Sequence, residues 1–246
     1  MRDRSNNLEQ ANSFGKAADV YASARPSYPA EVVDWLVPAG AVDVLDVGAG
    51  TGKLTELLAD GRRRVVAVDP SAEMLAQLSS RMPGVETHVA SAESLPLADD
   101  SVDAVTVAQA WHWINPEKAS PELARVLRPG GTLGLVWNTR DASVGWVAHL
   151  DEIMGADPHY GPEGHPVVCA PFLPLETWRT RWSQSLTRDG LLDLVRSRSF
   201  FITASPERQA ETLERVRELL DTHPQLAGRE AIELPYITEC FRTRTA

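Results

Sequence analysis

The sequence predicts an α/β protein with a doubly wound, mostly parallel sheet. Between residues 42 and 138, short segments rich in Val alternate with segments of helical length. The predicted strands cover residues 42–47, 63–69, 84–90, 103–109 and 131–137, and the predicted helices cover 52–61, 71–82 and 116–127. This alternation is typical of right-handed crossovers between parallel strands.

The whole chain, residues 1–246, is expected to form one domain. A predicted helix that ends at two prolines makes residues 1–30 a helical lid, and residues 31–138 hold the alternating core. Residues 139–180 are rich in Pro, Gly, His and Trp without a clear period, so we expect a long connection or lid there. Residues 181–246 then supply the C-terminal part of the sheet, with a predicted strand over 182–187, predicted helices over 188–200 and 205–220, and a closing strand over 231–244.

Composition argues against two classes of partner. The formal net charge of −10 gives no broad attraction to nucleic acid or to anionic lipid. No apolar stretch is long enough to cross a bilayer, and the first residues carry no signal-peptide pattern. The two cysteines, Cys169 and Cys240, are too few for a disulfide framework. We therefore expect a cytoplasmic protein without nucleic-acid or membrane partners, either a monomer or a homodimer.

A glycine loop follows the first predicted strand in the segment "LDVGAGTGKLT". Gly48, Gly50 and Gly52 let the backbone pass close to a ligand at a strand-to-helix turn. Asp69 ends the second strand, where a carboxylate can accept hydrogen bonds from both hydroxyls of a ribose. The pattern therefore predicts a nucleoside-containing cofactor.

The spacing of the glycines disfavours two other ligands. A dinucleotide fold requires its third glycine at position 53, which is Lys53 in this chain, and the phosphate-binding P-loop pattern is absent. A nicotinamide-dependent oxidoreductase on the same fold remains one alternative. A non-catalytic protein that binds the cofactor as a scaffold is the other.

Four segments resemble the class I S-adenosylmethionine-dependent methyltransferases, in the small-molecule branch that includes ubiquinone-biosynthesis and trans-aconitate methyltransferases. They are "VLDVGAGTG", "VVAVDPSAEML", "ASAESLPLADDSVDAVTVAQAWHW" and "LARVLRPGGTLGLV". The N-terminal "FGKAADVYASARPSYP" and the later "WHWI" are similar to the trans-aconitate subgroup. The resemblance implies S-adenosyl-L-methionine as cofactor and a Rossmann-like, seven-stranded sheet of order 3-2-1-4-5-7-6 with strand 7 antiparallel.

The resemblance also implies roles for the cofactor-binding loop. Gly48 and Gly50 would approach the methionine part of the cofactor, with Gly52 in the same loop. Asp69 would hold the ribose. Asp46 would organise the loop or bind the cofactor's amino group.

Further cofactor contacts are implied around the adenine. Met74 would pack near the ring, while the backbone amide of Ala92 and the carboxylate of Glu93 would meet its polar edge. Many relatives carry Asp where this chain has Ser91, which leaves open which side chain meets the adenine amine. Gln109 would offer its backbone carbonyl to the methionine ammonium.

The acceptor site is expected where the fourth strand ends, because doubly wound folds bind ligands beside their crossover point. Trp111, His112 and Trp113 follow that strand. The tryptophans either line a dry acceptor pocket or pack in the core, and His112 either acts as a base for a hydroxyl acceptor or bonds a neighbouring backbone group.

The trans-aconitate resemblance favours O-methylation of a carboxylate on a small molecule, although a hydroxyl acceptor stays open. Arg25 would bind such a carboxylate or make a structural salt bridge, and Tyr21 and Tyr28 belong to the same lid. We expect no metal, because the irregular spacing of His159, His165 and Cys169 matches no zinc pattern.

Overall fold

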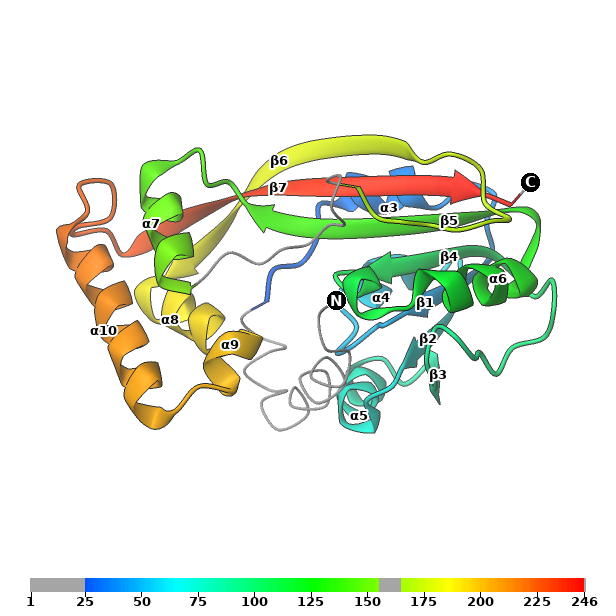
Figure 1. Cartoon of the computed structure of the whole chain (residues 1–246), viewed down its shortest axis with the longest axis horizontal. Coiled ribbons are helices and arrows are strands. Elements are labelled where there is room, and N and C mark those ends of the chain that lie inside the picture. The colour runs from blue at the N-terminus through cyan, green and yellow to red at the C-terminus, as the bar shows by residue number, and fades with distance from the viewer. Residues whose placement is uncertain (1–24, 155–164, 246) are drawn as a thin grey trace. The chain divides into compact units, whose positions relative to one another are not determined.

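The computed structural model describes residues 25–154 and 165–245. Within them, seven strands form one sheet in the order β3-β2-β1-β4-β5-β7-β6, with β7 antiparallel (Figure 1). The predicted fold class and strand order are therefore confirmed. The strands are β1 (Asp43–Val47), β2 (Arg64–Asp69), β3 (Glu86–Val89), β4 (Val102–Ala108), β5 (Leu127–Arg140), β6 (Glu176–Thr187) and β7 (Ala231–Arg244).

The helices alternate with the strands along the first part of the chain. They are α3 (Ala30–Leu36), α4 (Thr55–Leu58), α5 (Ala72–Arg81), the 3-10 helix η2 (Trp111–Trp113), α6 (Pro116–Val126), α7 (Gly145–Met154), α8 (Arg188–Arg196), α9 (Ser199–Ile202) and α10 (Pro206–Thr222). None of the helices in these described ranges is long and apolar enough to cross a membrane. Of the predicted lid over residues 1–30, residues 1–24 lie outside the described residues.

The chain divides into two compact units, which we describe separately. Of the described residues, the core unit comprises 27–137, 165–179 and 239–245, and the helical unit comprises 25–26, 138–154 and 180–238. In the core unit β1 pairs in parallel with β2 and β4, β2 pairs with β3, and β4 pairs with β5. Because Val47 lies beside both Val68 and Val107, the carboxyl ends of β1, β2 and β4 meet at one edge.

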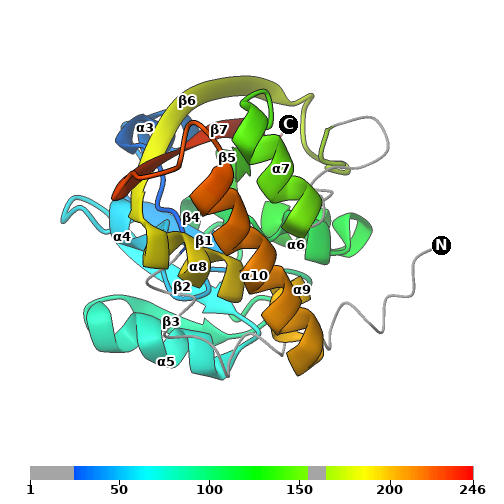
Figure 2. The same ribbon diagram turned by 90° about the vertical axis from the view of Figure 1, so that its left-hand side faces the viewer.

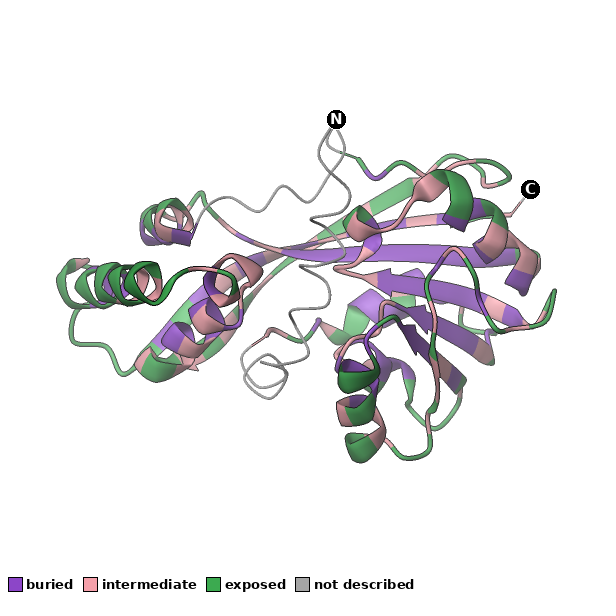
Figure 3. Ribbon diagram, turned by 60° about the horizontal axis from the view of Figure 1, so that its bottom comes forward, coloured by how far each residue is buried: buried purple, intermediate pink, exposed green. Residues whose placement is uncertain are grey.

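The strands of the core sheet are largely buried, as the purple ribbons in Figure 3 show. Their apolar side chains alternate between the two faces of the sheet. Val44 and Ala104 face a cluster that includes residues of α3 and α4, whereas Leu45 and Val105 face a cluster that includes residues of α6. The period of two along each strand thus produces a sheet covered by helices on both sides.

The helical unit has a separate hydrophobic cluster. Helix α10 packs along α7 and α8, as Figure 2 shows. Buried side chains from these helices meet Leu234 and Tyr236 of β7 and the half-buried Trp182 of β6.

Polar side chains define several helix starts. Ser71 accepts a hydrogen bond from the backbone of Met74 at the start of α5. Asn115 and Ser205 cap α6 and α10, each followed by a proline at the first helical position. These are the cap residues that helix termini require, because the first N–H groups lack partners within the helix.

Three elements differ from the sequence prediction. Helix α4 is only four residues long, because the chain turns through residues 51–54 before it becomes helical. Residues 139–180, expected to be a connection, contain α7 and the first residues of β6. In β5 the pairing shifts between Val102 and Ala104 of β4, so residues 128–131 form an irregularity within the strand.

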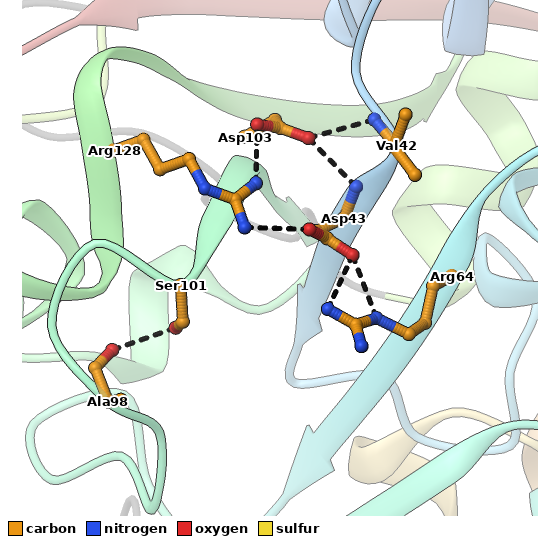
Figure 4. A network of polar contacts seen from close by, with 7 residues as sticks. All are labelled: Val42, Asp43, Arg64, Ala98, Ser101, Asp103 and Arg128. Atoms are coloured by element: carbon orange, nitrogen blue, oxygen red, sulfur yellow. Dashed lines mark hydrogen bonds and ion pairs between the residues drawn. The ribbon is translucent and has the colours of Figure 1, made fainter.

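Charged side chains tie together the amino ends of the core strands (Figure 4). Arg128 donates to Asp43 of β1 at 2.7 Å and to Asp103 of β4 at 2.6 Å. Arg64 of β2 donates to the other oxygen of Asp43 at 2.7 Å. Asp103 also accepts the backbone N–H groups of Val42 and Asp43. This network lies at the edge of the sheet opposite to the glycine loop.

Candidate active site

The glycine loop leaves β1 in a conformation that L-residues rarely adopt. Gly48, Gly50 and Gly52 have φ angles of 67°, 56° and 88°. A Cβ atom on Gly48 would lie 2.6 Å from the Cβ atom of Ala110, so the close approach of β1 and β4 excludes any side chain there. A Cβ atom on Gly50 would meet no atom within 4 Å. The loop therefore presents open space at Gly50, as a backbone cradle for a ligand requires.

Asp69 is anchored at the end of β2 and is 9% exposed. One carboxylate oxygen accepts the N–H of Gly50 at 2.9 Å, and the other accepts the N–H of Ser71 at 2.8 Å. Burial raises the pKa of Asp69, and these two backbone N–H groups oppose the shift. Each oxygen keeps further acceptor capacity, because an ionised carboxylate accepts about four hydrogen bonds.

Asp46 lies buried in β1 directly before the glycine loop. Its two oxygens accept the hydroxyls of Thr55 at 2.6 Å and Thr106 at 3.0 Å. Burial raises the pKa of Asp46 to about 6, against the opposing effect of the two hydroxyls. Of the two roles expected for Asp46, these contacts support the organisation of the loop.

Sequence reasoning missed Thr51, which lies between Gly50 and Gly52. Its side chain is buried, and its hydroxyl has no hydrogen-bond partner among the described residues. Arg81 of α5 donates to the Thr51 carbonyl and so ties the loop to the next helix. The signal in the sequence was a hydroxyl side chain inside the glycine motif. In the structure this hydroxyl is a buried polar group without a partner among the described residues, and such a group calls for a ligand or a water.

The residues expected around adenine belong to the same unit. Met74 is buried on the first turn of α5, and Ala92 is buried after β3. Glu93 is half-buried and accepts the N–H of Asn115 at 2.9 Å, which links it to the start of α6. Ser91 is exposed and forms an isolated bridge with Ser94.

Gln109 has a φ angle of 55°, a region that is unusual for a residue other than glycine. It directly follows β4, and its backbone N–H donates to the Val136 carbonyl at 2.9 Å. Such backbone strain clusters at ligand sites, where the surrounding structure enforces it.

The aromatic segment after β4 separates into three environments. Trp111 is 4% exposed, packs in the core cluster, and donates its indole N–H to the Val167 carbonyl at 2.9 Å. His112 is exposed and lies against Trp113, with ring centroids 4.8 Å apart. Trp113 is half-buried. His112 and Trp113 are therefore the members of this segment that solvent reaches.

The residues expected in the lid are not gathered in one unit. Tyr28 is buried against α3 in the core unit. Arg25 belongs to the helical unit, where it donates to the Ser197 carbonyl at 3.1 Å. Tyr21 and His159 lie outside the described residues. Within the described ranges, no three His, Cys, Asp or Glu side chains gather in a way that could hold a metal ion.

Comparison with known proteins identifies the class to which this site belongs. A family model described as a methyltransferase domain matches residues 45–135, the segment from β1 to β5. An uncharacterized methyltransferase of Mycobacterium tuberculosis is 51% identical over 239 residues, which cover 95% of this chain and 96% of the relative. A methyltransferase-like protein of Schizosaccharomyces pombe is 35% identical, with 90% and 91% of the two chains covered.

A solved structure from Anaeromyxobacter dehalogenans, proposed to be a type II methyltransferase, has the same fold. The TM-score is 0.66 at 26% sequence identity, and the match covers 90% of this chain and 97% of the other. The chain belongs to the class I S-adenosylmethionine-dependent methyltransferases. The resemblance of the four segments to this family is therefore confirmed.

Proposed function

We propose that the glycine loop and Asp69 hold S-adenosyl-L-methionine, and that the methyl group is transferred to an oxygen of a small molecule. The observation that carries this proposal is the loop itself. Gly50 adjoins open space, the Thr51 hydroxyl is buried without a hydrogen-bond partner among the described residues, and the Asp69 carboxylate has acceptor capacity left. These features fit a ribose and an amino-acid group better than they fit an empty turn.

The bound cofactor would supply a methyl group that its sulfonium sulfur already activates. The protein then has to position the two reactants and exclude water, which can lower the barrier by about 7–11 kcal/mol. Gly48 and Gly50 would take the methionine part, Asp69 the ribose, and Met74, Ala92 and Glu93 the adenine. The strained backbone of Gln109 supports its proposed role, in which the carbonyl accepts from the methionine ammonium.

We further propose a carboxylate or a hydroxyl as the acceptor, beside the aromatic segment after β4. A carboxylate needs no base at neutral pH. A hydroxyl does, and we propose the exposed imidazole of His112 as the group that accepts its proton. Within the helical unit, Arg25 is our candidate for binding a carboxylate.

A screen for methyl transfer tests this function. The full chain is incubated with S-adenosylmethionine carrying a labelled methyl group and with small organic acids, phenols and quinols. We expect a labelled ester or ether from at least one class, and much less of it with Asp69→Asn, which weakens cofactor binding. Label transfer that is unaffected by Asp69→Asn would remove Asp69 from the proposed site.

A further inference from the structure

Arg140 of β5 and Tyr236 of β7 lie opposite each other in the helical unit. The N–H of Asp141 donates to the Pro235 carbonyl at 2.9 Å, which fixes the antiparallel register of the two strands there. Because Asp141 lies beside Pro235, Arg140 lies beside Tyr236. Both residues are largely buried, with 8% and 3% of their surface exposed. Two polar groups are thus held side by side in the interior of the unit.

The hydrogen-bonding capacity of this pair is mostly unused. Arg140 donates from Nε to Asp151 at 2.5 Å. Among the described residues, its two terminal nitrogens make no hydrogen bond or ion pair, and neither does the Tyr236 hydroxyl. None of these three groups is completely enclosed, so each keeps some contact with solvent. Buried donors of this kind are costly unless something accepts from them.

The surroundings hold both groups in place and favour negative charge. Trp182 of β6 stacks on Tyr236, with ring centroids 5.2 Å apart and planes inclined by 20°. Burial raises the pKa of Tyr236. The positive charges of Arg140, Arg198 and Arg25 oppose that shift, and the negative charge of Asp151 adds to it with the smallest effect. The tyrosine therefore remains protonated and able to donate, in a region to which three guanidinium groups contribute positive potential.

We propose that Arg140 and Tyr236 form a binding site for the carboxylate group of a small organic acid. The two terminal nitrogens of a guanidinium match the two oxygens of a carboxylate, and the tyrosine hydroxyl adds a third donor. Asp151 orients the guanidinium through Nε and leaves its outer edge for the ligand. All residues of the site belong to the helical unit, and the inference does not depend on the roles proposed for the glycine loop.

Calorimetry on the full chain without cofactor tests the site. The probes are succinate and citrate, with dimethyl succinate as the neutral counterpart and inorganic phosphate as the competing anion. We expect one of the two acids to bind at one site per chain, and the neutral ester not to bind. Absence of binding by both acids, or binding of phosphate alone, overturns the proposal.

Two variants assign the binding to these residues. Tyr236→Phe removes only the hydroxyl and keeps the stack on Trp182, and Arg140→Lys keeps a positive charge opposite Asp151 but loses the paired donors. We expect each variant to bind the acid about tenfold more weakly, or weaker still. Arg181→Gln is the matched control, because Arg181 is an exposed arginine of the same unit, 3.5 Å from Asp141. Equal affinity in the parent and Tyr236→Phe, with near-UV circular dichroism showing native packing, overturns the assignment.

Adding S-adenosylmethionine then distinguishes two roles for the bound acid. Methylation of the bound acid identifies it as the acceptor, and binding without methylation identifies it as an effector. Both outcomes support the site, because the binding itself is measured without the cofactor.

Discussion

At the scale of single residues, the fold makes the ionisation of Asp46 unfavourable. Its carboxyl is buried, and its pKa rises from 3.8 to about 6. Between these values the native state keeps a proton that the unfolded chain has released, so the free energy of unfolding falls as pH rises through this window. At 1.36 kcal/mol per pKa unit, the loss amounts to about 3 kcal/mol.

Asp46→Asn should remove this pH dependence, because the amide does not titrate and the two threonine hydroxyls can reorient toward it. Urea unfolding of the parent and the variant between pH 4 and pH 7 measures the difference. The raised pKa of Asp69 acts in the same direction in both proteins, so the comparison isolates Asp46. Parallel stability curves for the two proteins would show that Asp46 titrates normally.

Trp111 and His112 are adjacent in sequence but should respond to mutation in different ways. Trp111 is buried, and Trp111→Ala should reduce the free energy of unfolding by about 3–5 kcal/mol, as expected for a large cavity in a core. Trp111→Phe keeps most of the packing and loses the hydrogen bond to Val167, so its cost should be clearly smaller. A Trp111→Ala protein with parental stability and reduced turnover would instead place this side chain in the acceptor pocket.

His112→Ala should change the free energy of unfolding by no more than about 0.5 kcal/mol, because the imidazole is exposed. With a hydroxyl acceptor it should lower methyl transfer at saturating cofactor, and the acidic limb of the pH–rate profile should disappear. The cofactor affinity, measured by calorimetry, serves as the control and should stay within a few-fold of the parent. An unchanged rate and profile with a hydroxyl acceptor would exclude His112 as the base.

At the residue scale, the sequence predicted identities better than environments. The glycines and Asp69 were recognisable because their chemistry is local to a strand-to-helix turn. The sequence could not show that Asp69 accepts from Gly50 and Ser71, or that Trp111 turns inward while His112 turns outward. Those outcomes depend on packing between segments distant in the chain, such as the contact of Trp111 with Val167.

At the scale of elements, one arginine joins two strands at the amino edge of the core sheet. Arg128 pairs with Asp43 of β1 and with Asp103 of β4, whereas Arg64, among the described residues, pairs only with Asp43. Arg128→Met should therefore lower the melting temperature more than Arg64→Met does. Scanning calorimetry at low and high salt measures both variants, and both differences should shrink at high salt because the groups are partly exposed. Equal melting temperatures for the two variants would contradict the bridging role.

Helices and strands were predicted correctly where the hydrophobic period was regular. They were missed where a helix or part of a strand lies within a segment that has the composition of a loop. The parallel strands β1, β2, β4 and β5 are marked by their several Val and Leu residues. Only residues 182–187 of β6 were predicted, although the alternation of Trp178, Thr180, Trp182, Gln184 and Leu186 continues through the longer strand. Helix α7 was hidden within a segment whose prolines, glycines and histidines suggested a connection.

At the scale of the whole molecule, we propose that residues 1–246 act as a single methyltransferase domain. Strands β5, β6 and β7 each contribute residues to both compact units, so unfolding of one unit should break strands of the other. Scanning calorimetry should show one cooperative transition, which S-adenosylmethionine shifts upward as a whole. Two transitions, only one of which responds to the cofactor, would show that the units unfold independently.

The central claim is that the glycine loop binds S-adenosylmethionine, and calorimetric titration of two glycine variants tests it most directly. Gly50 and Gly61 both have positive φ angles, of 56° and 84°, and both have open space where a Cβ atom would be added. Gly50→Ala and Gly61→Ala should therefore carry a similar backbone strain and lose similar stability, about 1–2 kcal/mol.

Only the Gly50 substitution places a methyl group in the proposed cofactor cradle. The account predicts that Gly61→Ala binds S-adenosylmethionine with parental affinity, while Gly50→Ala binds it at least about tenfold more weakly, a loss of roughly 1.4 kcal/mol. Parental affinity in a folded Gly50→Ala protein would contradict the account, because the cofactor would then have to bind away from this loop.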